Sequence, residues 1–180
     1  MDNAIIPECY VDTNLIETLV PPAKRNNWRG YNHQKGCGGV ARTMKNEFSD
    51  RFALGIIDKD KLQVDYLNEF TQDINYGSLI LHKHATRHHY IIQISPAIER
   101  FIFDNAASVG INVGDFDLPS YFQEFKKETK TENSKNNQRF KNLFKTLYQN
   151  GATDFVRLTA WVKYLKEENY KADWQILNSL

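Results

Sequence analysis

The chain has few of the features that mark secreted or membrane proteins. Only two of its 180 residues are cysteines, Cys9 and Cys37, and they form neither a Cys-x-x-Cys pair nor a Cys/His spacing typical of zinc sites. No apolar run approaches the roughly 20 residues of a membrane-spanning helix. The start of the chain also lacks the basic residues and long apolar stretch of a secretory signal. We therefore expect a cytoplasmic protein with reduced thiols and no membrane partner.

Net charge is almost absent as well. The 23 Lys and Arg residues are balanced by 22 Asp and Glu residues, which leaves a formal charge of +1. Such a chain has no overall field that attracts nucleic acid, so any nucleic-acid binding must come from a local cationic surface. The hydrophobic share of 41% and the aromatic share of 13% are typical of globular proteins. At this length we predict a single domain over residues 1–180.

Strand and helix patterns alternate over the first hundred residues. Short apolar runs predict strands, and apolar residues at intervals of three or four predict helices. The expected strands lie at 4–11, 52–57, 79–81 and 90–94, and the expected helices at 15–20, 40–48 and 96–103. Asn14 and Ser95 are the expected N-caps of the first and third helices. This order predicts an α/β fold in which helices flank a mostly parallel central sheet.

The C-terminal third is expected to form a helical extension. Apolar residues at helical spacing predict helices at 140–150 and 156–165. The segment Lys126–Asn137 is rich in charge and poor in apolar residues, so we predict that it is the most mobile internal loop. The α/β core then covers about residues 4–105, and the helical part covers about residues 118–180.

Carboxylates stand where two of the predicted strands end. Glu8 lies at the polar end of the first strand, with Asp12 four residues later, and Asp58 and Asp60 follow the second apolar run. In open α/β sheets, ligands bind beyond the carboxyl ends of the strands. Mg²⁺ prefers oxygen ligands and usually takes one or two carboxylates, with water and substrate phosphate completing its octahedron. The sequence therefore predicts a Mg²⁺ (or Mn²⁺) site in which Asp58 and Asp60 share the ion.

These residues resemble the Toprim domain of topoisomerases, primases and overcoming-lysogenisation-defect (OLD) type nucleases. That family has a strand-end Glu, usually followed by Gly, with an Asp shortly after it, and a later apolar strand that ends in Asp-x-Asp. Residues 5–12 (IIPECYVD) look like the first motif and residues 55–60 (GIIDKD) look like the second, with Cys9 where the family usually has Gly. The intervening Gly-rich turn and helix also fit, and the resemblance covers about residues 4–61.

The resemblance implies roles for individual residues. Glu8 would be the catalytic general acid/base or a metal ligand, and Asp58 and Asp60 would be metal ligands. Asp12 is a candidate further member of the acidic site, as is Glu99, because some bacterial Toprim-like proteins carry a Pro-x-x-Glu that matches residues 96–99. Each of these two also has a simpler interpretation, Asp12 as a helix N-cap and Glu99 as a solvated carboxylate in the first turn of a helix. The implied activity is Mg²⁺-dependent phosphoryl-transfer or nuclease chemistry on nucleic acid in a bacterial protein.

Two alternatives stay open. The first is a PIN-type metal-dependent nuclease, whose opening strand residues 9–17 also resemble, with Asp12 as the first metal ligand. Its later acidic residues would come from Glu47, Asp104, Asp115 and Asp117. The second alternative is a non-catalytic Toprim-like binding or assembly protein, or one that works only with a partner subunit that carries an ATPase.

Cations that could contact phosphate are concentrated in three stretches. Histidines and basic residues crowd residues 82–89, which we predict to be a loop, and Lys83, Arg87 and His88 are its candidate phosphate contacts. Residues 24–33 mix cations with aromatic side chains, as proteins that bind single strands do. The third stretch, residues 124–145, contains seven Lys and Arg residues and only three Glu residues.

Overall fold

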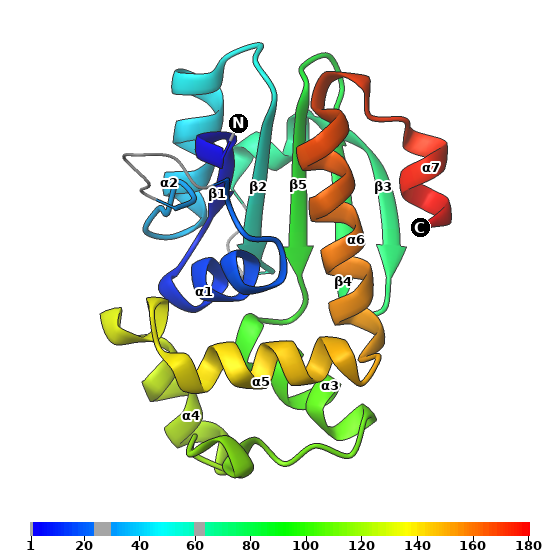
Figure 1. Cartoon of the computed structure of the whole chain (residues 1–180). Coiled ribbons are helices and arrows are strands. Elements are labelled where there is room, and N and C mark those ends of the chain that lie inside the picture. The colour runs from blue at the N-terminus through cyan, green and yellow to red at the C-terminus, as the bar shows by residue number, and fades with distance from the viewer. Residues whose placement is uncertain (1, 24–29, 60–63) are drawn as a thin grey trace.

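The computed structural model describes residues 2–23, 30–59 and 64–180, and within them five strands form one open sheet in the order β1-β2-β5-β4-β3 (Figure 1). The strands are β1 Ile5–Pro7, β2 Ala53–Asp58, β3 Phe70–Tyr76, β4 Leu79–His84 and β5 His89–Ile94. β1, β2 and β5 are parallel, whereas β4 and β3 pair in antiparallel fashion. The fold is therefore α/β as expected, but the sheet is mixed, because only its first three strands follow the parallel arrangement.

Strands β3 and β4 form a hairpin in the antiparallel half of the sheet. The sequence patterns did not predict β3. Only two residues of β3, Phe70 and Ile74, are buried, because the strand lies at the edge of the sheet. The turn into β4 uses Gly77 at φ +53°, where a Cβ atom would lie 2.1 Å from Oδ1 of Asp154. The other carboxylate oxygen of Asp154 accepts a hydrogen bond from the Ser78 N–H at 3.1 Å. The hairpin is thus fixed by a residue 76 positions away, which no local pattern reveals.

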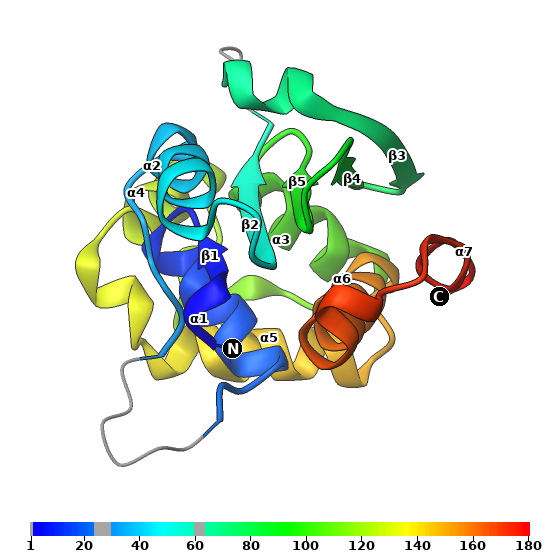
Figure 2. The same ribbon diagram turned by 90° about the horizontal axis from the view of Figure 1, so that it is seen from above.

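Helices cover both faces of the sheet (Figure 2). They are α1 Tyr10–Leu19, α2 Cys37–Arg42 with its π-helical continuation η2 Thr43–Phe48, α3 Ile98–Ser108, α4 Phe122–Thr129, α5 Gln138–Gln149, α6 Thr153–Glu168 and α7 Trp174–Ser179. Short 3-10 turns lie at η1 Asp2–Ala4, η3 Asp65–Glu69, η4 Val113–Phe116, η5 Glu132–Lys135 and η6 Asn169–Lys171. No described helix is both long and apolar enough to cross a membrane.

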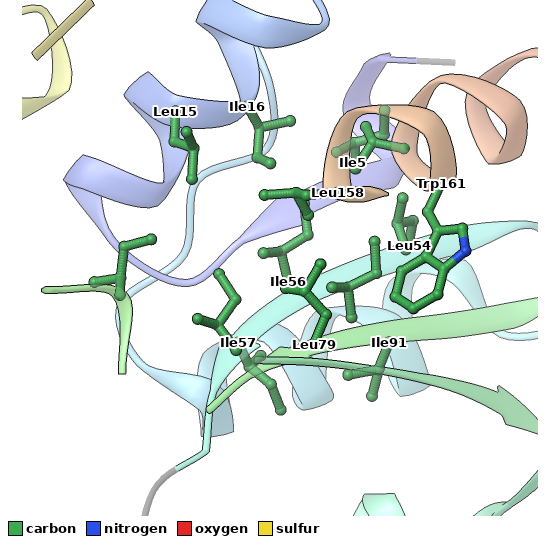
Figure 3. Packing of buried hydrophobic residues seen from close by; sticks show 14 of the residues in the cluster. Ile5, Leu15, Ile16, Leu54, Ile56, Ile57, Leu79, Ile91, Leu158 and Trp161 are labelled. Carbon is green, nitrogen blue, oxygen red and sulfur yellow. The ribbon is translucent and has the colours of Figure 1, made fainter. Parts of the chain in front are cut away.

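Two close contacts show how the helices are fitted to the sheet. On one face, Leu158 and Trp161 of α6 pack over strand residues that include Leu54 and Ile56 (Figure 3). On the other face, α2 and η2 approach β2 at Gly55, where a Cβ atom would lie 2.8 Å from Met44 Sδ. A larger residue at position 55 would therefore push the helix away from the sheet.

Two helices begin at other residues than the sequence indicates. α1 begins at Tyr10 with Cys9 as its N-cap, not after Asn14. Asn14 is instead buried inside the helix and donates a hydrogen bond to the Ser134 carbonyl at 2.6 Å. α3 begins at Ile98 after Ala97, not at Ser95, because the Ile98 N–H is capped by a carboxylate from the end of β2. A local capping box between Cys9 and Asp12 starts α1, whereas a long-range contact, invisible in the local sequence, caps α3.

The segment Lys126–Asn137, which we predicted to be the most mobile internal loop, contains helical structure and two buried residues. It contains the end of α4 and the turn η5. Thr129 is 2% exposed and Ser134 is fully buried, and the Ser134 hydroxyl donates to the Thr129 carbonyl at 2.8 Å. The segment is held by hydrogen bonds among small polar residues and not by apolar side chains, which is why its composition resembles that of a loop.

Candidate acidic site at the carboxyl edge of the sheet

The candidate site lies where β1, β2 and β5 end. Glu8 directly follows β1, and Asp58 is the last residue of β2. Glu99 stands in the first turn of α3, the helix that follows β5. Because the three strands are parallel neighbours, their carboxyl ends meet at one edge of the sheet, above α3 and α4 in Figure 1. This is the edge at which open α/β sheets bind ligands.

Hydrogen bonds fix Glu8 and Asp58 side by side. Oε2 of Glu8 accepts the Asp58 backbone N–H at 2.8 Å, and the Glu8 backbone N–H continues the ladder by donating to the Ile56 carbonyl at 3.0 Å. Oδ1 of Asp58 in turn accepts the Ile98 N–H at 2.9 Å, at the N-terminus of α3. The sequence-based expectation that Glu8 and Asp58 lie together is therefore met. Asp60, the expected second ligand, lies outside the described residues.

Asp12 joins the same cluster from α1. Its Oδ2 accepts the Cys9 N–H at 3.1 Å, while the Cys9 sulfur accepts the Asp12 N–H at 3.5 Å, so the pair forms a capping box. The side chain of Asp12 is therefore part of a helix cap, although it is not the N-cap residue itself. It is only 1% exposed, and its other oxygen, Oδ1, is buried without a hydrogen-bond partner among the described residues. Such an orphan carboxylate oxygen is costly unless something satisfies it.

The residue at position 9 explains how the chain replaces the usual glycine. Cys9 has φ −135° and ψ 176°, an extended conformation that does not require glycine. Its side chain serves as the helix cap instead. Burial, followed by the nearby charge of Asp12, raises the pKa of the Cys9 thiol far above its usual range. The sulfur is therefore a neutral thiol, which excludes it as a thiolate nucleophile.

Burial and neighbouring carboxylates raise the pKa values of Asp58 and Asp12. Burial, followed by the charges of Asp12, Glu8 and Glu99, raises the pKa of Asp58 to about 9. Burial also raises the pKa of Asp12 to about 7, with further contributions from Glu8 and Glu99. Glu99, expected to be solvated, is 6% exposed and accepts a hydrogen bond from the Thr129 hydroxyl at 3.1 Å. Groups that cannot easily all ionise together are typical of sites that await a cation or a proton.

Three of the clustered carboxylates line a pocket of about 320 Å³. Glu8, Asp58 and Glu99 contribute its acidic wall, and Lys126, Thr129 and Lys130 of the α4 region contribute another. The sequence had marked residues 124–145 as cationic but not which of them face the site. The spacing of Lys126 and Lys130, one helical turn apart, was the available signal for two lysines on one side of α4. Each follows a buried residue, Phe125 or Thr129, and both line the pocket.

The residues present fit a hard divalent cation. All of the clustered donors are carboxylate oxygens, and Oδ1 of Asp12 has no other partner among the described residues. No group of three described His, Cys, Asp or Glu side chains converges closely enough to hold a metal by itself. Mg²⁺ tolerates this arrangement, because it commonly takes one or two carboxylates and fills its octahedron with water and substrate phosphate.

The further acidic residues expected for a PIN-type site do not share the buried environment of Asp12. Glu47, Asp104, Asp115 and Asp117 are all exposed, whereas Asp12 is buried. Asp104 instead faces Arg100 one helical turn earlier, at 3.7 Å. The charges that raise the pKa of Asp12 come from Glu8 and Glu99. The structure therefore groups Asp12 with Glu8 and Glu99.

The basic stretch 82–89 is not at this site, which corrects its interpretation as a loop at the site. Lys83 lies within β4, beside Tyr90 of β5, and only residues 85–88 form the turn. That turn precedes β5, so Arg87 and His88 lie at the opposite end of the sheet from Asp58. Arg87 faces Asp50 there, at 3.9 Å. Residues 24–29 of the other basic aromatic stretch lie outside the described residues.

A larger hollow elsewhere lacks the chemistry of a catalytic site. It measures about 480 Å³ and lies between the end of α1 and α6. Its lysine Lys166 is already paired with Asp2 at 3.0 Å and donates to the Pro21 carbonyl at 2.9 Å. The acidic pocket is thus the better candidate, although it is smaller. No protein-family model, no curated protein and no solved structure matches the chain.

Proposed function

We propose that this protein performs Mg²⁺-assisted phosphoryl chemistry on nucleic acid, of nuclease type, at a Toprim-like acidic site. The observation that carries the proposal is the cluster of Glu8, Asp12, Asp58 and Glu99 at one sheet edge, in which two pKa values are raised and one buried oxygen has no partner among the described residues. A divalent cation offsets the mutual repulsion of such carboxylates. Lysines in the same pocket suit an anionic substrate.

Two of the carboxylates have distinct proposed roles, which their hydrogen bonds support. Asp58 is the principal metal ligand, because Oδ1 is anchored by the Ile98 N–H while Oδ2 accepts no hydrogen bond from the described residues. Glu8 is oriented by the Asp58 N–H and lines the pocket, where it is placed to give or take a proton as general acid/base. When bound, the metal ion would lower the pKa of its water and offset charge on a phosphoryl oxygen.

The resemblance to Toprim domains supports this assignment on two points. It requires the strand-end Glu and the Asp-x-Asp strand to be neighbours, and β1 pairs directly with β2. It also places a Pro-x-x-Glu carboxylate at the site, and Glu99 contributes to the electrostatic environment of Asp58. The helices α4–α7 lie outside the part that the resemblance covers, which is about residues 4–61 and extends to Glu99 through the Pro-x-x-Glu match.

Metal titration with matched variants tests the proposal. The experiment compares Mg²⁺ and Mn²⁺ binding by calorimetry, and cleavage of single-stranded and duplex DNA and RNA, in wild type and Asp58→Asn. The control is Asp115→Asn, the same chemical change at an exposed residue of η4. We expect Asp58→Asn to lose metal binding and cleavage, and Asp115→Asn to keep both. If wild type binds neither ion at millimolar concentrations, the enzymatic proposal fails and a non-catalytic binding or assembly role takes its place.

A further inference from the structure

In the part of the chain that the structure describes, the side-chain ammonium groups of two lysines on the α4 side of the acidic pocket make no contact that stabilises the fold. Lys126 lies in α4 and Lys130 is the residue at its C-terminal end, one helical turn later. Both line the pocket that contains Glu8 and Asp58. Neither ammonium group forms an ion pair or a hydrogen bond with the described residues, although the Lys126 carbonyl accepts the Thr129 hydroxyl at 2.9 Å. Residues one turn apart on a helix lie on the same side, so the two ammonium groups act on the same region of the pocket.

Another cation of this region, Arg139, is committed to the fold. Arg139 binds Glu128, with Nη2 at 2.5 Å from Oε1, and also donates to the Asp117 carbonyl at 2.6 Å. Lysine near a helix C-terminus is favoured by the helix dipole, which accounts for a basic residue at position 130. The dipole also favours Lys126, which lies in the last turn of α4, but it does not account for the way both side chains line the acidic pocket.

The helix that carries these lysines is tied directly to the acidic residues. The Thr129 hydroxyl, between the two lysines, donates to Oε1 of Glu99. Phe125, fully buried, packs edge-on against Phe103 of α3 with ring centroids 4.9 Å apart. The spacing between the lysines and the carboxylates is therefore set by two buried contacts between α3 and α4. A rigid spacing of this kind selects a ligand of matching length.

The size of the pocket restricts which nucleic acid can use it. At about 320 Å³ it lies at the small end of the range for ligand sites, which suits one nucleotide and not a double helix. Tyr10 also lines the pocket, and its ring is stacked on His33 with centroids 4.4 Å apart. Cations together with an aromatic ring beside a groove are the usual means of binding an unpaired strand.

We propose that Lys126 and Lys130 form a phosphate-binding subsite for single-stranded nucleic acid, which holds the backbone phosphate adjacent to the one that the acidic site acts on. This inference rests on the proposed function. The lysines are positioning residues: they contact the strand but not the reacting phosphate, and they keep that phosphate against Glu8 and Asp58.

The test measures binding of a short fluorescein-labelled oligothymidylate as a function of NaCl concentration, with Mg²⁺ present. All proteins carry Glu8→Gln so that the probe stays intact. The test variant is Lys126→Gln/Lys130→Gln, and the matched control is Lys127→Gln, an exposed lysine of the same helix that does not line the pocket. A third protein, Lys126→Arg/Lys130→Arg, keeps both charges. Mg²⁺ affinity without the probe is measured on each by calorimetry.

We expect the double Gln variant to lower the salt slope of log K by about 1.4, which corresponds to a loss of affinity on the order of 25-fold at 0.1 M salt. Lys127→Gln and the double Arg variant should stay within about twofold of the parent, and Mg²⁺ affinity should not change. An unchanged slope in the double Gln variant overturns the subsite, as does an equal loss in Lys127→Gln, which would show a diffuse surface charge. Equal affinity for duplex overturns the single-strand assignment. Failure of the subsite with Mg²⁺ binding retained leaves the proposed function intact, whereas absence of Mg²⁺ binding in wild type ends both.

Discussion

Asp58→Asn should stabilise the protein that it inactivates. In the folded state the pKa of Asp58 is raised to about 9 by burial and by its acidic neighbours, whereas an unfolded Asp titrates near pH 3.9. A raised pKa means that the folded state favours the protonated form. The contribution of this carboxyl to stability is therefore lost progressively as pH rises from about 4 to 9. The amide cannot ionise, so it avoids that loss, and its oxygen can still accept the Ile98 N–H.

The size of the effect follows from the shift. Each pKa unit is worth about 1.4 kcal/mol, so a fully buried Asp that stays protonated at pH 8, where the unfolded Asp is ionised, would lower stability by about 5–6 kcal/mol. Asp58 keeps part of its contact with solvent, and solvent screens the repulsion. We therefore expect Asp58→Asn to raise the free energy of unfolding by about 2 kcal/mol at pH 8, and by about 0.5 kcal/mol at pH 5.

Urea unfolding followed by tryptophan fluorescence measures this difference, with EDTA present to remove divalent ions. Wild type, Asp58→Asn and Asp115→Asn are compared at pH 5 and pH 8 at one ionic strength. Asp115→Asn should be close to wild type at both pH values, because that residue is exposed. The electrostatic description of the site would be refuted if Asp58→Asn were less stable than wild type at pH 8. It would also be refuted if the gain in unfolding free energy did not grow with pH.

Three further substitutions check other parts of the structure. Asp12→Asn should change the free energy of unfolding by less than about 1 kcal/mol at pH 6, because the amide oxygen can still accept the Cys9 N–H; if it abolishes cleavage while Asp58→Asn is mild, the site is PIN-type instead. Cys9→Ser should keep both cleavage and the melting temperature within a few degrees, because the hydroxyl is a good helix cap; a complete loss of activity would show a chemical role for the thiol. Gly55→Ala should cost about 1–3 kcal/mol in chemical denaturation, because the new methyl group meets Met44, and an unchanged midpoint would mean that η2 shifts freely.

The sequence was sufficient for the parallel part of the fold and for the position of the site within it. The apolar run of β2 is buried on both faces and ends at Asp58, and β1 ends next to Glu8, so strand-end reasoning brings the two carboxylates together. Periodicity likewise located α5 and α6, whose buried residues recur every three or four positions.

What the sequence could not supply depends on contacts between distant residues. The edge strand β3 buries only two side chains, so its pattern is too weak to identify a strand. The folded state of residues 126–137 depends on Asn14 and on the Thr129–Glu99 hydrogen bond. Residue types alone also did not show that the basic turn lies at the wrong end of the sheet, since that follows from the antiparallel pairing of β4 with β5.

Diffraction from crystals soaked in MnCl₂, with data collected at the manganese absorption edge, tests the central claim most directly. We expect one strong anomalous peak at the carboxyl edge of β1 and β2, within about 2.3 Å of a carboxylate oxygen of Asp58, with the remaining ligands drawn from neighbouring carboxylates and water. In Asp58→Asn crystals the peak should be absent. No peak at the acidic cluster, or a peak only at another place such as the His82–Asp73 pair on the hairpin, would contradict the account.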